Sequence, residues 1–267
     1  MFVIDHATSN DILFPAGCGR GMAPRDYTVN PPEMYASPDT MTLIPESEWE
    51  ARIKEQEERK SSLSHIRKKG NNGDKIWALN QGRFGYCWSH STTHAVMLRR
   101  AADMLHFVEL SAFAVAAIIK KARDEGGWCG LSCKFIRTTG IPSTKTWPQG
   151  VVDLKLDTPQ MRAEAARYRI FEDWYDLAKP EHGQKLSRQQ IMTLLLNNIP
   201  VAADFAWWGH SVCLMSAKIV EPGVIGYEIL NSWYESPGKE WGDEGTAILV
   251  GERAIPFGAV GVAQTVA

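Results

Sequence analysis

Asn80-Gln81-Gly82-Arg83-Phe84-Gly85-Tyr86-Cys87-Trp88-Ser89-His90-Ser91 is the most informative stretch of this sequence. Gly82 and Gly85 predict a tight turn, because glycine adopts positive φ angles without strain. From Cys87 the pattern predicts a helix that runs to about Phe107. A cysteine at a helix N-terminus lies at the positive end of the helix dipole, which favours the thiolate over the thiol. We expect the Gln81 amide to face the sulfur across the turn, and a nucleophile beside a neutral donor is what acyl transfer needs.

A base and an orienting group occur further along the chain. Gly209-His210-Ser211-Val212 places a histidine beside a short apolar run, and Asn231-Ser232-Trp233 follows a strand-like run that ends at Leu230. Each residue alone has an ordinary alternative, since Cys87 and His210 suit a core and Asn231 suits a turn. Their joint occurrence favours a nucleophile, a base and a residue that orients the base.

These motifs together resemble the papain-like cysteine peptidases. The resemblance covers about residues 64–148 and 186–250, with each motif in the family's order. The spacing from Cys87 to Asn231 lies within the family range of about 130–150 residues, and the spacing to His210 is slightly short. The motifs that carry it are Gln81-Gly82, Gly85, Cys87-Trp88, His210-Ser211-Val212, Asn231-Ser232-Trp233 and Trp241-Gly242-Asp243-Glu244-Gly245.

The resemblance implies an α+β fold of two lobes, one helical and one an antiparallel, β-barrel-like lobe, preceded by an N-terminal extension. It implies that Cys87 is the nucleophile, that His210 takes its proton and that Asn231 holds the imidazole. Gln81 and the Cys87 backbone N–H would form the oxyanion hole, and Trp233 would shield the His–Asn bond. The thiolate–imidazolium pair would hold the pKa of the cysteine well below its free value of about 8.5.

A glycine-rich segment at residues 126–132 is similar to the one on which relatives bind substrate backbone by strand-like hydrogen bonds. The candidate substrate-binding residues are Gly127, Trp128, Gly130 and Trp233. One departure concerns the walls of the cleft. Only nine residues separate Pro200 from His210, where relatives make a longer excursion that builds part of the wall. This shortening leaves room for a non-catalytic descendant of the fold.

We expect three parts in the chain: an arm plus a charged helix at 1–60, a helical lobe at 61–148 and a β-rich lobe at 149–267. Residues 1–45 are rich in Gly, Pro, Asn and Ser, which indicates loop or extended structure. Ser47 with Glu50 forms a capping-box pattern before a charged helix from Trp49 to Lys60. That helix has three interpretations: a solvated surface helix, a pro-segment remnant that covers the cleft, or an assembly arm.

Periodicity predicts the remaining elements. We expect helices at 112–121 after Ser111, at 161–168, and after Ser187. We expect strands at 168–171, 201–205, 212–220, 226–230, 246–250 and 258–262, with a hairpin turn at Glu221-Pro222-Gly223.

The cysteines and histidines leave a few possibilities open. There are five cysteines, and Phe84 stands where secreted relatives carry a disulfide partner of the nucleophile. Cys129 and Cys133 remain candidates to pair, but a zinc site lacks further ligands nearby. His90 and His94 have the i, i+4 spacing of a metal pair, with ordinary packing as the alternative. We therefore expect no metal and no cofactor.

Composition and charge limit the partners and the cellular location that we expect for the protein. The chain has 267 residues, 44% hydrophobic and 22% charged, with a net charge of −2, which allows a sizeable core and implies no nucleic-acid or membrane partner. We see no signal peptide and no membrane-spanning run. With the absent disulfide partner, this predicts a reducing setting, cytoplasmic or virion-associated.

The sequence thus predicts a cysteine-type peptidase that hydrolyses peptide bonds of peptide or protein substrates through a thioester acyl-enzyme. The alternative is a papain-fold structural or assembly protein, for example in a virion, with reduced or no peptidase activity and contacts through residues 1–60. A third interpretation is a related acyl transfer such as amide crosslinking or deamidation.

Overall fold

The computed structural model describes residues 2–33, 41–69, 75–171, 174–177, 186–233, 241 and 244–266. Its helices are α1 (Asn10–Leu13), α2 (Trp49–Arg59), α3 (Leu63–Lys69), α4 (Cys87–Ala102), α5 (Ala112–Lys120), α6 (Cys129–Thr138), α7 (Pro159–Ala165) and α8 (Arg188–Leu196). Its strands are β1 (Val3–Ile4), β2 (Trp174–Asp176), β3 (Val201–Phe205), β4 (His210–Glu221), β5 (Val224–Leu230), β6 (Thr246–Leu249) and β7 (Gly258–Val262). Gly242 and Asp243, which belong to the last of the quoted motifs, lie outside the described residues.

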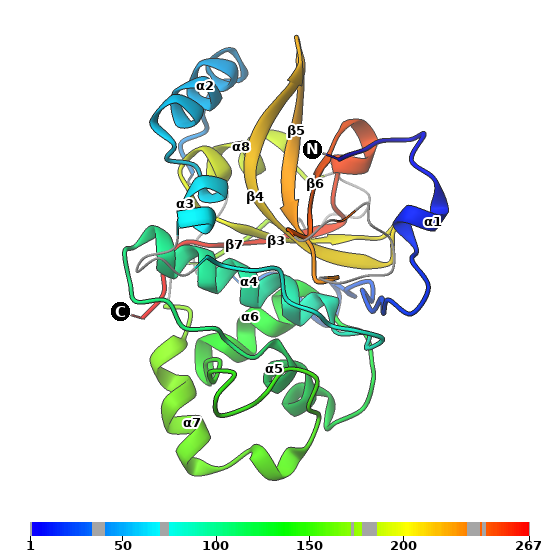
Figure 1. Ribbon diagram of the computed structural model, residues 1–267, viewed down its shortest axis with the longest axis vertical. Coiled ribbons are helices and arrows are strands. Elements are labelled where there is room, and N and C mark those ends of the chain that lie inside the picture. The colour runs from blue at the N-terminus through cyan, green and yellow to red at the C-terminus, as the bar shows by residue number, and fades with distance from the viewer. Residues whose placement is uncertain are drawn as a thin grey trace.

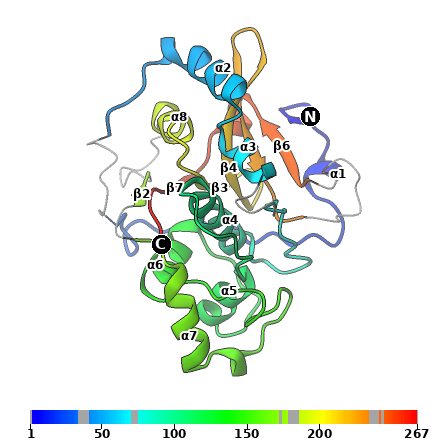
Figure 2. The same cartoon turned by 60° about the vertical axis from the view of Figure 1, so that its left-hand side comes forward.

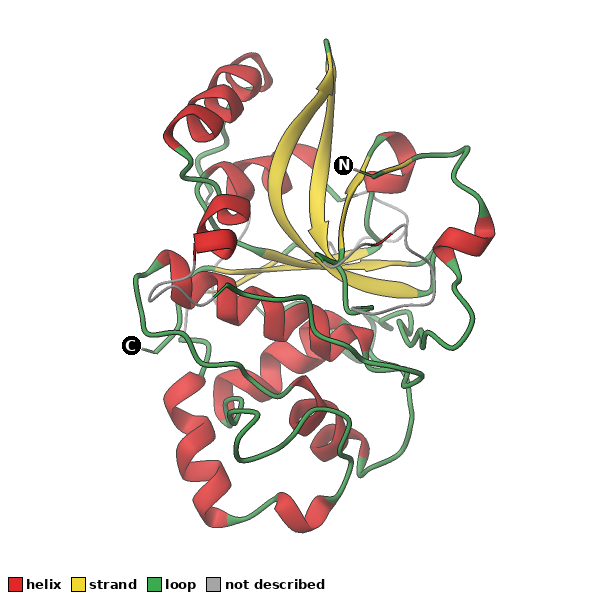
Figure 3. Ribbon diagram, in the orientation of Figure 1, coloured by secondary structure: helices red, strands yellow, loops and turns green. Residues whose placement is uncertain are grey.

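The molecule has a helical part and a sheet part (Figure 1). Helices α4 to α7 gather on one side of the sheet, and the long β4–β5 hairpin rises on the other (Figure 3). The strand order is β1-β6-β5-β4-β3-β7-β2, and every described pair is antiparallel except β1 with β6. The sheet is open, with β1 and β2 at its edges. The predicted α+β, papain-like fold class is confirmed.

Helix α4 lies between the sheet and helices α5 and α6 (Figure 2). All its residues except Arg99 and Ala102 are buried, as its small and apolar side chains require. The predicted end near Phe107 is wrong. The chain leaves the helix after Ala102 because Met104 adopts a left-handed φ of 61°, and Leu105 N–H then bonds the Arg100 carbonyl.

Serine caps position two helices as predicted. The Ser111 hydroxyl accepts a hydrogen bond from Ala114 N–H at the start of α5, and Ser187 accepts one from Gln190 N–H at the start of α8. The predicted capping box at Ser47 does not form. Residues Glu46–Glu48 make a 3-10 turn instead, and Glu48 precedes α2 without a side-chain cap.

Helix α2 packs against α8 and β4. Trp49 and Ile53 are buried there, and the Gln56 side chain donates to the Leu196 carbonyl at 3.1 Å. The interpretation of this helix as the cover of the cleft is therefore wrong, because residues 19–22 of the N-terminal arm make the contacts with the predicted nucleophile region.

Strands β3 to β7 lie where the sequence predicted strands, whereas β1 and β2 were not predicted. The hairpin of β4 and β5 turns at the predicted residues, where Gly223 has a φ of 79°. The strand predicted at 168–171 is reduced to a single bridge between Ile170 and Thr265, and the edge strand β2 comes later. No helix within the described ranges has the length and apolar character needed to cross a membrane.

Candidate active site

Cys87 is the first residue of α4, directly after the turn that Gly82 begins with a φ of 54°. Its side chain is fully buried. The Sγ atom accepts a hydrogen bond from Gly21 N–H at 3.3 Å. A residue of the N-terminal arm thus contacts the sulfur directly.

His210 begins β4, and its ring is held on two sides. Its Nε2 lies 2.7 Å from Asn231 Oδ1, and since that oxygen is an acceptor, Nε2 carries the proton. The Trp233 ring stacks on the imidazole with centroids 4.2 Å apart, and Trp208 meets its edge at 4.9 Å. Nδ1 has no hydrogen-bond partner among the described residues, so it is left as an acceptor for a proton.

Gln81 interlocks with the loop that carries Asn231. Its backbone N–H donates to the Ser232 carbonyl at 3.0 Å, and its side-chain oxygen accepts from the Ser232 hydroxyl. Asn80 forms an isolated antiparallel β-bridge with Trp233. The two side-chain N–H groups of Gln81 point the other way, to the carbonyls of Gly19 at 2.8 Å and Phe84 at 2.7 Å.

A segment that we call the strap, residues 15–33, runs through this site. Two consecutive amides of the strap join the nucleophile to the histidine loop: Gly21 N–H contacts Cys87 Sγ, and Met22 N–H donates to the Gly209 carbonyl at 3.1 Å. Gly209 directly precedes His210. Two adjacent residues of the strap therefore contact the predicted nucleophile and the loop that carries the predicted base.

The strap pairs with the glycine-rich segment like an added strand. Gly127 N–H donates to the Gly21 carbonyl and Ala23 N–H donates to the Gly127 carbonyl, both at 2.8 Å. The strap also lies so close to the nucleophile turn that side chains do not fit. A Cβ on Gly19 would lie 2.1 Å from the Phe84 carbonyl oxygen, and one on Gly21 would lie 1.9 Å from that of Gly85.

Sequence reasoning missed the strap, although its signal is visible. Glycines alternate at 17, 19 and 21, and we interpreted them as loop composition. Alternation in an extended segment puts every second residue on one face. Gly19 and Gly21 permit the close approach to the nucleophile turn, whereas Gly17 has open space around it and a positive φ of 81°.

The predicted substrate-binding residues all lie along the strap. Gly127 pairs with Met22, and Trp233 Nε1 donates to the Gly19 carbonyl at 3.2 Å. Trp128 is the N-cap residue of α6. A Cβ on Gly130 would lie 2.9 Å from Arg25 Nη1. The structure thus brings these four residues beside one extended segment of the chain.

Burial sets the protonation of the pair. It raises the pKa of Cys87 to about 11, against the lowering effect of the bonds from Gly21 and Ser211. It lowers the pKa of His210 to about 3, against the raising effect of the Asn231 bond. Burial thus favours the neutral thiol and the neutral imidazole in this structure, and the thiolate–imidazolium pair stays a prediction.

The other cysteines and histidines are explained by packing. His90 Nδ1 donates to the Tyr86 carbonyl at 2.8 Å, and His94 Nε2 accepts from Leu79 N–H at 2.9 Å. All five cysteines are free, so Cys129 and Cys133 do not pair. Cys129 Sγ instead donates to Asp204 at 3.1 Å. Within the described part of the chain no cluster of His, Cys, Asp and Glu suits a metal ion.

No protein-family model and no curated protein matches the chain. Solved structures do match. The chain is similar to xylellain, a cysteine protease from Xylella fastidiosa, with 15% identity and a TM-score of 0.60 over 93% of this chain and 97% of that one.

It is also similar to digestive procathepsin L 3 of the Tenebrio molitor larval midgut, with 20% identity and a TM-score of 0.55 over 69% of this chain. The ragweed pollen allergen Amb a 11, a cysteine protease in its proform, matches at 16% identity and a TM-score of 0.54 over 71% of this chain. The chain spans 65% and 63% of those two proteins, less than two thirds of their length. It therefore has the papain-like fold that these cysteine proteases share.

Proposed function

We propose that the protein is a cysteine-type peptidase that its own strap holds in a latent state. The observation that carries the proposal is the His210–Asn231 bond of 2.7 Å under the stacked Trp233 ring, at a loop that the strap joins to Cys87. A neutral imidazole that is oriented by an amide, with its second nitrogen free, is the arrangement that a general base for a thiol needs.

In the reaction, the Cys87 S–H proton passes to His210 Nδ1 as the sulfur attacks the carbonyl carbon of a peptide bond. Gln81 Nε2 stabilises the oxygen that becomes negative. The C–N bond then breaks, His210 gives its proton to the leaving amine, and a thioester remains on the sulfur. Water, deprotonated by His210, hydrolyses the thioester and restores the thiol.

The strap is bound as an inhibitor and not as a substrate. A scissile peptide must present its carbonyl carbon to the sulfur and the oxygen of the same peptide to Gln81. The strap presents the N–H of Gly21 to the sulfur, while Gln81 is bonded to the carbonyl of Gly19, two residues away. No single peptide group of the strap therefore meets both the nucleophile and the donor.

The test uses the full chain carrying Gly21→Ala, in which a Cβ would clash with the Gly85 backbone and displace the strap. A peptidyl vinyl sulfone should label this variant and dipeptide reporters should be cleaved. Both activities should vanish in Gly21→Ala/Cys87→Ala and persist in Gly21→Ala/Cys129→Ala. The matched control for the strap is Val29→Ala, because that side chain is exposed.

Labelling that survives Cys87→Ala and disappears with Cys129→Ala would refute the assignment of the nucleophile. A displaced strap with neither labelling nor turnover would favour the assembly role of the fold. In that case residues 2–33 should instead be required for co-purification in a large particle.

A further inference from the structure

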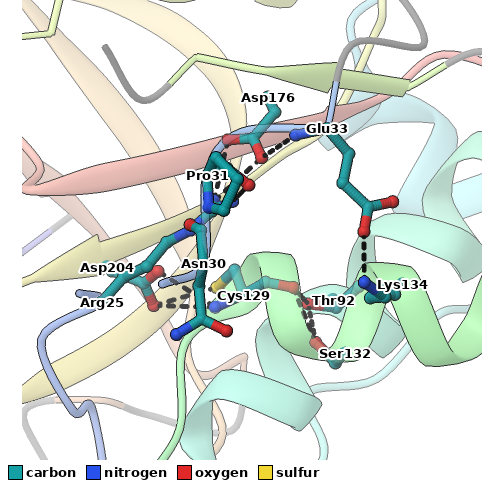
Figure 4. A network of polar contacts seen from close by, with 10 residues as sticks. All are labelled: Arg25, Asn30, Pro31, Glu33, Thr92, Cys129, Ser132, Lys134, Asp176 and Asp204. Carbon is teal, nitrogen blue, oxygen red and sulfur yellow. Dashed lines mark hydrogen bonds and ion pairs between the residues drawn. The ribbon is translucent and has the colours of Figure 1, made fainter. Parts of the chain in front are cut away.

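The strap places one charged side chain in the interior beside the site. Arg25 is 9% exposed. Its Nη1 donates to both carboxylate oxygens of Asp176, at 2.8 and 3.1 Å, while Nε and Nη2 donate to the carbonyls of Asn30 and Pro31 at 2.7 and 2.6 Å (Figure 4). The guanidinium is thus bound by a carboxylate of the body of the protein and by two carbonyls of the strap itself.

A second carboxylate lies on the same face of the sheet. Val260 of β7 is opposite Asp176 on one side and Ala202 on the other, and Asp204 lies two residues beyond Ala202, so both aspartates point the same way. Cys129 N–H at 3.0 Å and the Ser211 hydroxyl at 2.6 Å hold Asp204. Burial raises the pKa of Asp204 to about 6, while these hydrogen bonds and the nearby Arg25 cation lower it.

The first turn of α6 and β2 form the walls. A cavity of about 160 Å³ beside Arg25 is lined by Trp128, Gly130, Leu131, Lys134 and Trp174 of the body and by residues 29–33 of the strap. Gly130 is needed here, because a Cβ would lie 2.9 Å from Arg25 Nη1. We call the Asp176 carboxylate, which binds Arg25, together with the wall residues Trp128, Gly130 and Trp174 the acidic pocket.

The acidic pocket lies on the path of a bound peptide. Gly21 of the strap contacts the sulfur, Met22 pairs with Gly127, and Arg25 follows Gly21 by four residues. Asp204 accepts a hydrogen bond from the hydroxyl of Ser211, the residue that follows His210. The strap thus runs from the sulfur to Asp176 within a few residues, along the segment on which we propose that peptides bind.

We propose that the acidic pocket is a specificity site that binds an arginine or lysine side chain of the substrate, and that Arg25 fills it while the strap is in place. The inference rests on the proposed function. When the strap leaves, its two carbonyls leave with it, but the Asp176 carboxylate belongs to the body and loses the Arg25 cation. A cationic side chain restores that charge balance, and the planar fork of arginine fits Asp176 better than the ammonium of lysine.

The test measures kcat/KM on the Gly21→Ala chain. The substrates are fluorogenic peptides that carry a single Arg, Lys or norleucine at each of the four positions on either side of the cleaved bond. At one position we expect Arg to exceed norleucine by at least tenfold, with Lys in between. Asp176→Asn should bring the Arg-to-norleucine ratio close to one, because kcat/KM for the Arg peptide loses the carboxylate that binds the cation. Asp153→Asn, an exposed carboxylate at a 3-10 turn, is the matched control.

A second measurement needs no change in the pocket. Agmatine, a free guanidinium compound, should inhibit cleavage of the Arg peptide competitively in Gly21→Ala. Turnover of neutral peptides without any basic preference, or a preference that survives Asp176→Asn, would overturn this inference and leave the peptidase proposal intact. Absence of both turnover and Cys87 labelling would overturn the two together.

Discussion

The sulfur of Cys87 shows how a single residue depends on its cover. The sequence predicted a thiol activated by a helix N-terminus, and the residue does begin α4. Burial of the side chain then raises its pKa, against the lowering effect of the hydrogen bond from Gly21. The activating position was predictable from local pattern, whereas the burial depends on tertiary packing around the sulfur, which includes a residue 66 positions away.

Displacing the strap should lower the pKa of Cys87. In the wild-type chain the thiol should ionise only as pH approaches about 11, because the buried thiolate is poorly solvated. In Gly21→Ala the ionisation should move below the free value of about 8.5, since water and His210 can then stabilise the pair. Thiolate ultraviolet absorbance, taken as the difference from Cys87→Ser in each background, measures it. Equal midpoints in the two backgrounds would show that the strap does not control the thiol.

Gln81 should contribute through the donor that the strap now occupies. In the Gly21→Ala background, Gln81→Glu keeps the shape of the side chain and removes its N–H groups, so kcat should fall by about 10²–10³. Gln160→Glu adds the same charge at an exposed position on α7 and should have no effect. An unchanged kcat in Gln81→Glu would exclude this residue from the oxyanion hole.

The helices and strands that the sequence predicted correctly are those with strong local patterns, such as a serine cap or a turn glycine. Ser111 and Ser187 cap their helices as expected, and the β4–β5 hairpin turns at Gly223. The end of α4 was missed because Met104 takes a left-handed conformation that composition favours in glycine. The strap was missed because its pairing partner Gly127 is far away in sequence, and the alternating glycines indicate a close approach without identifying that partner.

The strap as an element should be held by Arg25. Arg25→Ala removes one partner of a buried ion pair, a change that costs about 3–5 kcal/mol when the other charge stays buried. Here the strap can dissociate and expose Asp176 to water. We therefore expect the variant to release the strap from the site more often. Labelling of Cys87 by a vinyl sulfone should accelerate at least tenfold.

Two control variants accompany Arg25→Ala. Arg25→Lys keeps the charge but loses the bidentate fork, and should give an intermediate rate. Arg59→Ala, an exposed ion pair on α2, should label like the wild type. Faster labelling in Arg59→Ala, or none in Arg25→Ala, would place the restraint elsewhere.

The whole molecule should lose stability in mild acid. His90, His94 and His210 are fully buried, and burial lowers each pKa, to about 4 for His90 and about 3 for His210. As pH falls from about 6.5, the unfolded chain takes up protons at these positions and the native chain does not, so the free energy of unfolding decreases. Asp204 has the opposite effect on stability, because its pKa is raised to about 6 and the native chain takes up this proton at a higher pH than the unfolded chain does. It is one group against three histidines, so the net effect of acid is a loss of stability.

Urea unfolding near pH 7.5 and pH 5 measures this dependence, which should reach several kcal/mol because each pKa unit corresponds to about 1.4 kcal/mol. His90→Asn should reduce the difference between the two pH values, and His6→Asn, an exposed histidine, should not. A chain that is equally stable at both pH values would contradict the assignment of these histidines as neutral groups.

The parallel pairing of β1 with β6 has a consequence for maturation. The N-terminal arm is anchored on both sides of the strap. Before the strap, β1 pairs with β6 of the sheet; after the strap, α2 packs against α8. Trp208 and Trp241 also bond the carbonyls of Leu13 and Ile12. A protease that nicks the strap would therefore open the groove without shedding a peptide. The product should run as two fragments on a denaturing gel and as one particle in gel filtration.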